Sequence, residues 1–265
     1  MMMNSIQAPH SLNPILDLCR QFIPYLDGCF EDPAAASQQQ IQGNQWLTGR
    51  TCDRSTIQAL IDDLKSQHPD AGHAYIQART WHLLCWQPVY IAFISIYGLQ
   101  RLPDFNHFKQ QRQHNAIIGF KFESAEITVD KEEQLISQAA KQLKTLFAHY
   151  REQLDSVQRC RPHYANRFVA DLILGTLIKV KDVNAHFTDQ KILQHAQLWL
   201  KHMELSSTFI KALKIKHNQP ISFVRTSCCL ADKVNQSLCS DCPKVHKNNN
   251  TQKYKTADIQ TMVIN

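Results

Sequence analysis

The chain has 265 residues, of which 43% are hydrophobic and 20% charged, a composition typical of globular proteins that argues against wholesale disorder. The net charge of +6 is modest and no segment interleaves aromatic residues with Lys and Arg, so we expect no nucleic-acid partner. Nine cysteines in a chain whose first residues lack the basic and apolar regions of a secretory signal favour a cytoplasmic protein with thiols or a metal site rather than disulfides.

Apolar spacing predicts three helical regions in the first hundred residues. The first covers 13–26, and the second covers 55–66 and is capped by the serine at its start. Residues 32–44 between them form a polar connector of low complexity. The third region runs from near residue 69 to 98, with a kink or interruption at Pro88.

The most apolar stretch of the chain, 81–99, is about as long as a membrane span but contains His82, Gln87 and Pro88. We therefore interpret it as a buried helix and expect no transmembrane segment.

The hydrophobic period then changes to that of strands. The runs 115–122 and 125–129 are short and rich in β-branched and aromatic residues, which predicts a β-hairpin turning at Glu123 and Ser124. Only seven glycines in the whole chain favour a helix-rich protein.

Helical periodicity returns at Lys131. Its apolar stripe recurs at helical spacing and consists of Leu135, Ala139, Leu143, Leu146, Phe147, Tyr150 and Leu154. Two more apolar helices are predicted at about 166–181 and 189–203. In the latter, His195, Trp199 and Met203 indicate core packing rather than a cofactor pocket.

These elements predict a mainly helical α+β protein, with helices packed on a small antiparallel sheet. We divide the chain into a domain of residues 1–219 and a C-terminal segment of residues 220–265, which begins with a short strand, Ile221 to Val224. The sequence after Cys242 is basic and rich in Asn, which indicates a surface tail or a docking patch for an acidic partner.

Four of the cysteines lie within fifteen residues with the spacing C-C-x₉-C-x₂-C; they are Cys228, Cys229, Cys239 and Cys242. The other five are dispersed and are expected to be small buried hydrophobic residues; they are Cys19, Cys29, Cys52, Cys85 and Cys160.

Three chemistries could use the clustered thiols. A zinc site needs four thiolates converging on one ion, which is awkward for two adjacent cysteines. A two-iron cluster offers two metal centres and relaxes that demand. A redox-active C-x-x-C pair would need a βαβ setting and would leave the vicinal pair unexplained. Spacing alone favours the cluster but leaves the other two chemistries open.

The segment VRTSCCLADKVNQSLCSDCPK resembles the C-terminal signature of the FhuF-like ferric-siderophore reductases. In that family an Arg precedes a vicinal Cys pair and a C-x-x-C-P follows about ten residues later, matched here by Arg225, the four clustered cysteines and Pro243. The nine-residue spacer is one shorter than the resemblance leads us to expect. Residues 75–244 are similar to the family, most specifically at the cysteines.

The resemblance implies a [2Fe–2S] cluster on Cys228, Cys229, Cys239 and Cys242 that reduces Fe(III) held by a siderophore, of the hydroxamate class. Hard hydroxamate oxygens suit Fe(III), so one added electron weakens the complex. We expect Ser227, Ser240 and the backbone amides after Cys239 to donate hydrogen bonds to sulfur. Positive charge around the cluster or its substrate is expected from the following side chains: Arg225, Lys233, Lys244 and His246.

The chain has no G-x-G-x-x-G turn, so we expect the electron to come from a separate donor, such as a ferredoxin or a flavin reductase. A peripheral association with the inner face of the inner membrane stays open. The alternative function is a non-enzymatic module, either a zinc-stabilised binding protein or an iron–sulfur redox sensor. A third possibility is a siderophore synthetase, since the C-terminal region of those enzymes shares the FhuF-like fold; it is disfavoured because they need nucleotide binding and carry no such cysteine set.

Overall fold

A computed structural model describes residues 11–31, 45–216, 219–235 and 237–245. Its helices are α1 (Asn13–Phe22), α2 (Arg54–Gln67), α3 (His73–Leu99), α4 (Glu132–Asp155), α5 (Pro162–Ile178), α6 (Val180–Val183), α7 (Asp189–His202) and α8 (Asp232–Asn235). Its strands are β1 (Gly28–Phe30), β2 (Trp46–Leu47), β3 (Arg101–Pro103), β4 (Phe108–Gln113), β5 (Ala116–Phe122), β6 (Ile127–Val129), β7 (Leu213–Lys216) and β8 (Gln219–Phe223). The predicted mainly helical α+β class is confirmed.

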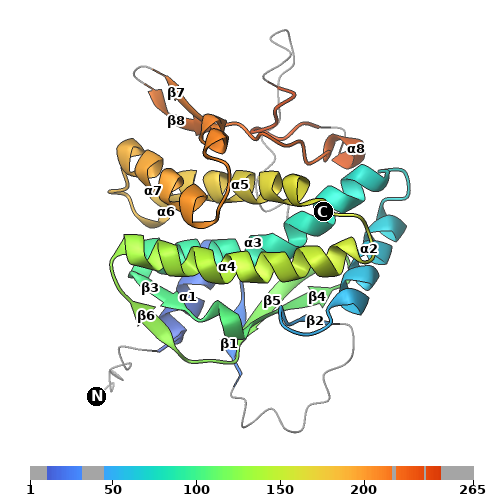
Figure 1. The fold of residues 1–265 in the computed structure, drawn as a ribbon, viewed down its shortest axis with the longest axis horizontal. Coiled ribbons are helices and arrows are strands. Elements are labelled where there is room, and N and C mark those ends of the chain that lie inside the picture. Colours follow the sequence, from blue (N-terminus) through green and yellow to red (C-terminus); the bar gives the residue numbers. More distant parts are fainter. Residues whose placement is uncertain (1–10, 32–44, 217–218, 236, 246–265) are drawn as a thin grey trace.

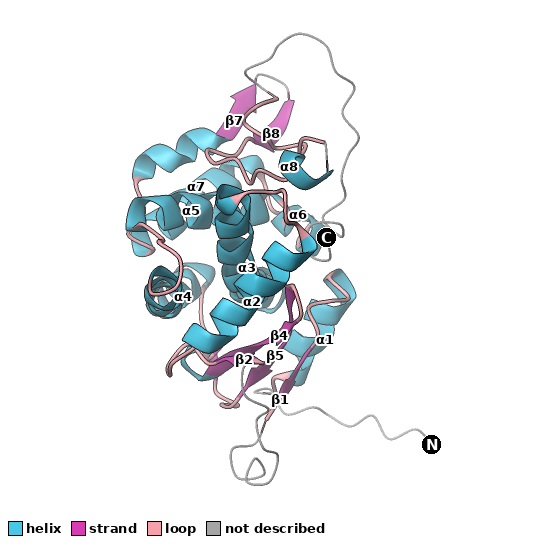
Figure 2. Cartoon of the chain, turned by 90° about the vertical axis from the view of Figure 1, so that its right-hand side faces the viewer, coloured by secondary structure: helices cyan, strands magenta, loops and turns pink. Residues whose placement is uncertain are grey.

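The elements form layers. A four-stranded sheet lies at one end of the molecule, α3 and α4 cross the middle, α5 and α7 lie beyond them, and the β7–β8 hairpin with the chain leading to α8 covers the opposite end (Figures 1 and 2). The sequence after β8 therefore rests on helices and lies far from the sheet.

Helix α3 is the central helix of the fold. Among the described residues it is the one helix long and apolar enough to cross a membrane, and 78% of that apolar window is buried inside the protein. Its apolar surface is therefore covered by the protein's own helices and sheet, which confirms the predicted buried helix. It begins at His73, later than predicted, because Gly72, with φ of 77° and ψ of 160°, has a non-helical conformation that favours glycine. Pro88 lies inside the helix without ending it.

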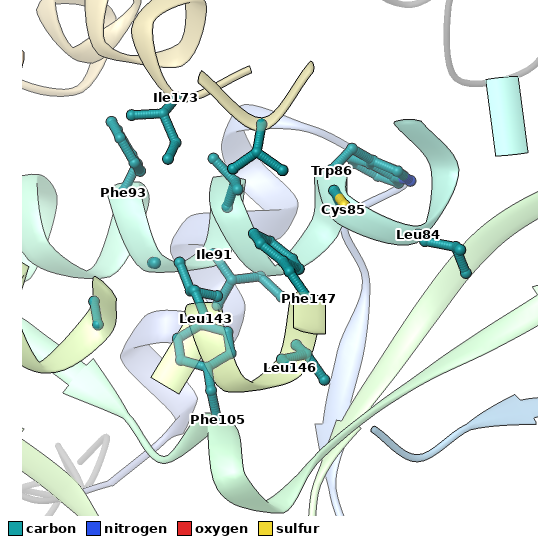
Figure 3. Close-up of a cluster of buried hydrophobic side chains, with 14 of the residues drawn as sticks. Leu84, Cys85, Trp86, Ile91, Phe93, Phe105, Leu143, Leu146, Phe147 and Ile173 are labelled. Carbon is teal, nitrogen blue, oxygen red and sulfur yellow. The ribbon is translucent and has the colours of Figure 1, made fainter. Parts of the chain in front are cut away.

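Helix α4 confirms the predicted stripe, because all seven of its residues are buried. Figure 3 shows Leu143, Leu146 and Phe147 of α4 among the buried side chains around α3, with Phe105 on the sheet side and Ile173 on the α5 side. His195 and Trp199 of α7, and Met203 directly after it, are also buried, as expected for core residues.

The predicted hairpin is wrong. Strand β5 pairs antiparallel with β4 and not with β6, which instead pairs with β3. The true hairpin turns at His114, where φ is 52°. Strand β4 was not predicted because its sequence, FKQQRQ, is largely polar. It forms a strand because it pairs with β5. Because β1 adds to β5 in parallel, the four-stranded sheet, in the order β1-β5-β4-β2, is mixed rather than antiparallel.

Helix boundaries differ from the predictions for local reasons. Helix α1 ends at Phe22 because Ile23, which precedes Pro24, is extended. Helix α2 begins at Arg54, so the predicted cap Ser55 lies inside it. Helix α5 begins earlier than predicted, at Pro162, a residue preorganised for the first helical turn. The predicted connector, 32–44, lies outside the described residues.

Two of the five dispersed cysteines are not buried. Cys29 in β1 and Cys52 before α2 are exposed, whereas Cys19, Cys85 and Cys160 are buried as expected. The predicted strand before the cysteine cluster is β8, which starts at Gln219, so the predicted domain boundary falls inside this strand. Its partner β7 was not predicted.

Candidate metal centre

The candidate site is built on residues 224–245, called here the cysteine segment, which leaves β8 and runs over α5 with little regular structure (Figure 1). Cys228 and Cys229 are half-buried, while Cys239 and Cys242 are 6% and 2% exposed. The segment thus buries the two cysteines of the C-x-x-C and leaves the vicinal pair partly accessible to solvent.

The four thiols form two pairs, and each pair joins one vicinal cysteine to one cysteine of the C-x-x-C. The Sγ atoms of Cys229 and Cys239 are 3.3 Å apart. Cys242 interacts with Cys228 through its thiol. Within the C-x-x-C, a backbone hydrogen bond of 3.0 Å from Cys242 N to Cys239 O closes a turn.

The pKa values of three of the paired thiols are shifted in different directions. The hydrogen bond with Cys239 lowers the pKa of the Cys229 thiol to about 6, and the nearby Arg225 cation and the backbone amide of Ala231 act in the same direction. Interaction with the Cys229 thiolate raises the pKa of Cys239, and burial raises that of Cys242. Cys229 therefore carries the negative charge more readily than Cys239 or Cys242.

Arg225 is the cation of the site. Its Nε donates to Asp241 Oδ2 at 2.7 Å, and its backbone amide donates to Asp241 O at 2.9 Å. Burial lowers the pKa of Arg225, but the Asp241 carboxylate and the thiolates of Cys229 and Cys239 outweigh this and raise it above its ordinary value. Arg225 thus joins the start of the cysteine segment to its C-x-x-C turn.

A buried carboxylate on α5 anchors the same segment. Asp171, 5% exposed, accepts from the backbone amides of Thr226 and Ser227 at 2.8 and 2.7 Å. Arg167 donates to the carbonyl of Thr226. The residues just before the vicinal cysteines are therefore fixed to a rigid helix.

The predicted ring of positive charge is present in part. Arg225 lies close enough to interact with the thiolates, as expected. Lys244 donates to Asp232 Oδ2 at 2.6 Å, which raises its pKa, so much of its charge is compensated. Lys233 is exposed on α8. His246 lies outside the described residues.

Two residues of α3 near the site were missed. Arg79, 9% exposed, and Tyr75 both interact electrostatically with Cys229. An arginine within the apolar 27-residue helix was the available signal, because a buried cation needs a partner. Backbone amides reach two of the sulfurs: that of Lys244, which follows Cys239 as expected, donates to Cys242, and that of Ala231, which was not expected, donates to Cys229. The Ser227 hydroxyl is buried, and Ser240 is exposed.

The donor chemistry fits a two-iron cluster. Two thiolates bound at about 2.3 Å to one tetrahedral ion lie about 3.8 Å apart, close to the 3.3 Å between the thiols of Cys229 and Cys239. Cys229 and Cys239 thus have nearly the spacing of two ligands of one iron, and the interaction of Cys228 with Cys242 supplies a second pair for the other iron of such a cluster. Within the described ranges, no three His, Cys, Asp or Glu side chains are gathered around a single point.

No protein-family model matches this chain. The search of solved structures found no match either. The resemblance to the FhuF-like reductases stays a prediction, carried by the motif around the four cysteines.

Proposed function

We propose that this protein is a ferric-siderophore reductase that holds a [2Fe–2S] cluster on Cys228, Cys229, Cys239 and Cys242. The observation that carries the proposal is the pairing of the thiols, with Cys229 beside Cys239 and Cys228 beside Cys242. The sequence motif around them supplies the substrate class.

Such a cluster, when bound, supplies single-electron transfer. The chain's own residues set the conditions for it. Arg225, held against Asp241, offsets the negative charge of the thiolates. The amides of Ala231 and Lys244 donate to two of the sulfurs, and both effects stabilise the more negative, reduced state.

The electron balance of the reaction is simple. One electron enters from an external carrier, such as a ferredoxin or a flavin reductase, and Fe(III) in the siderophore becomes Fe(II). No bond to the substrate forms or breaks in the electron transfer itself. Because hydroxamate oxygens hold Fe(II) weakly, the metal is then released. We place this reaction in the cytoplasm, with peripheral contact with the inner membrane as an option.

The test of the cofactor is anaerobic purification followed by analysis of iron, acid-labile sulfide and zinc. We expect a brown protein with two irons and two sulfides per chain that bleaches with dithionite. A colourless protein with one zinc per chain would contradict the proposal and favour the zinc-stabilised module.

A further inference from the structure

A cavity of about 220 Å³ opens beside the cysteine segment, between α3 and α5. One wall is the segment itself, through Arg225, Ser240 and Asp241. Ser240 and Asp241 are the two residues between Cys239 and Cys242 in the sequence. A molecule in this cavity therefore touches the loop that carries the thiols.

The other walls are largely apolar and aromatic. They include Trp86 and Tyr90 of α3, Phe168 and Leu172 of α5, and Phe223 at the end of β8. A second cavity of about 170 Å³ shares Tyr90 and other lining residues with the first. The two cavities are adjacent, and their summed volume lies near the lower end of the range for small-molecule sites, which is about 300–1,000 Å³.

The formal charges of the side chains that line the cavity sum to zero. Two cations, Lys179 and Arg225, and two carboxylates, Asp171 and Asp241, line it. Both carboxylates are engaged by the cysteine segment, Asp171 by backbone amides and Asp241 by Arg225. Burial, with the nearby cations, lowers the pKa of His82 to about 3, so this ring adds no charge at neutral pH.

The polar groups facing a ligand are few. Among the described residues, the ammonium of Lys179 donates to the hydroxyl of Tyr90 at 3.2 Å. The hydroxyl of Thr176 is engaged within α5, where it donates to Leu172 O at 2.7 Å. Lys179 and Tyr90 can therefore donate to oxygens of a ligand while the aromatic walls cover its apolar parts.

We propose that this cavity binds the ferric complex, in the form of an oxygen-ligated chelate with an apolar backbone and little net charge. The ligand class rests on the proposed function, and the place rests on the cavity. The formal neutrality of the walls favours a neutral trihydroxamate complex over a strongly anionic tris-catecholate complex, since the latter would bring several negative charges against carboxylates. Binding here seats the metal beside the loop of Cys239 and Cys242.

The test uses a redox-inert probe, the gallium(III) complex of ferrichrome, titrated calorimetrically into the anaerobic, cluster-loaded protein. Leu172→Trp fills the cavity and is expected to weaken binding at least about tenfold. Lys179→Gln replaces the cationic donor with a shorter neutral amide and is expected to weaken it about threefold. The matched control, Asn166→Trp, puts the same side chain on an exposed position of α5 and is expected to bind like the wild type.

Circular dichroism and the visible spectrum check that each variant is folded and loaded. If Leu172→Trp does not fold, Lys179→Gln carries the test. Wild-type affinity in the folded cavity variants, no binding by the wild type, or tighter binding of a gallium tris-catecholate would overturn the proposal.

The two proposals can fail separately. If the gallium complex binds in the cavity but the reduced protein does not reduce ferric ferrichrome, the site stands and the function is wrong. If Leu172→Trp and Lys179→Gln reduce ferric ferrichrome as fast as the wild type at low substrate concentration, the function stands and the cavity is not its site.

Discussion

The helical body and the cysteine segment are held in place by different means. The body surrounds α3, and its residues pack against many apolar neighbours at once, so no single contact decides its structure (Figure 3). The cysteine segment has one short helix and depends on a few polar contacts, chiefly those of Asp171 and Arg225. The comparison teaches that the body can fold on apolar patterning, whereas the segment is ordered by individual groups that hold the thiols.

The largest expected effect is the loss of the cofactor without loss of the fold. Substituting any clustered cysteine, for example Cys239→Ser, is expected to abolish the visible spectrum while the helical content stays unchanged, because the body does not use these thiols. The matched control is Cys52→Ser, at an exposed dispersed cysteine. Absorption and far-ultraviolet circular dichroism measure both. A full spectrum in Cys239→Ser, or equal loss in the control, would remove the ligand assignment.

Disruption of the body is expected to be global. Leu143→Ala removes a fully buried side chain of α4 and is expected to cost about 3 kcal/mol of unfolding free energy, because the cavity it leaves cannot close. Urea denaturation measures this cost. Lys141→Ala, on the exposed side of the same helix, should change stability by less than about 0.5 kcal/mol. A small effect of Leu143→Ala would show that the core is not tightly packed.

Disruption of the segment is expected to be local. Arg225→Met leaves the partly buried Asp241 without its cation, at a cost of about 3 kcal/mol. Because the body does not depend on this pair, hydrogen exchange should quicken in residues 224–245 while α3 and α4 stay protected. Uniform loss of protection throughout the chain would mean that the two regions form one cooperative unit.

A pH-dependent effect, small near neutral pH, is expected at His82. Its pKa in the folded protein is about 3, below its ordinary value of 6.5. The unfolded chain therefore binds a proton that the folded chain does not, and stability falls as the pH drops from about 6.5 towards 3. One proton contributes at most about 1.4 kcal/mol per pH unit. His82→Gln should flatten this part of a denaturation profile; an unchanged slope would contradict the shift.

Only some elements of the fold could be predicted from the sequence. The stripe on α4 and the apolar run of α3 reveal buried helices, because helical spacing and burial are local properties of the sequence. Strand β4 stays hidden because its polar sequence becomes a strand only through pairing with β5. The exposure of Cys29 and Cys52 depends likewise on their neighbours in space.

For the site, the sequence shows that four thiols are close but not how they pair. The pairing of Cys229 with Cys239 depends on the path of the cysteine segment, which Asp171, more than fifty residues earlier, helps to fix. The approach of Arg79 from α3 joins residues that are still further apart in the sequence. Contacts of this kind depend on tertiary packing and leave no local pattern.

The most direct measurement of the central claim is a single turnover in a stopped-flow instrument. Anaerobic protein, reduced and freed of reductant, is mixed with a ferric trihydroxamate and an Fe(II)-trapping chelator. We predict that the oxidised cluster spectrum returns as fast as the siderophore's ferric absorption disappears, with one Fe(II) trapped per cluster. Cluster oxidation without Fe(II), or Fe(II) appearing at the rate seen with Cys239→Ser, would contradict the account.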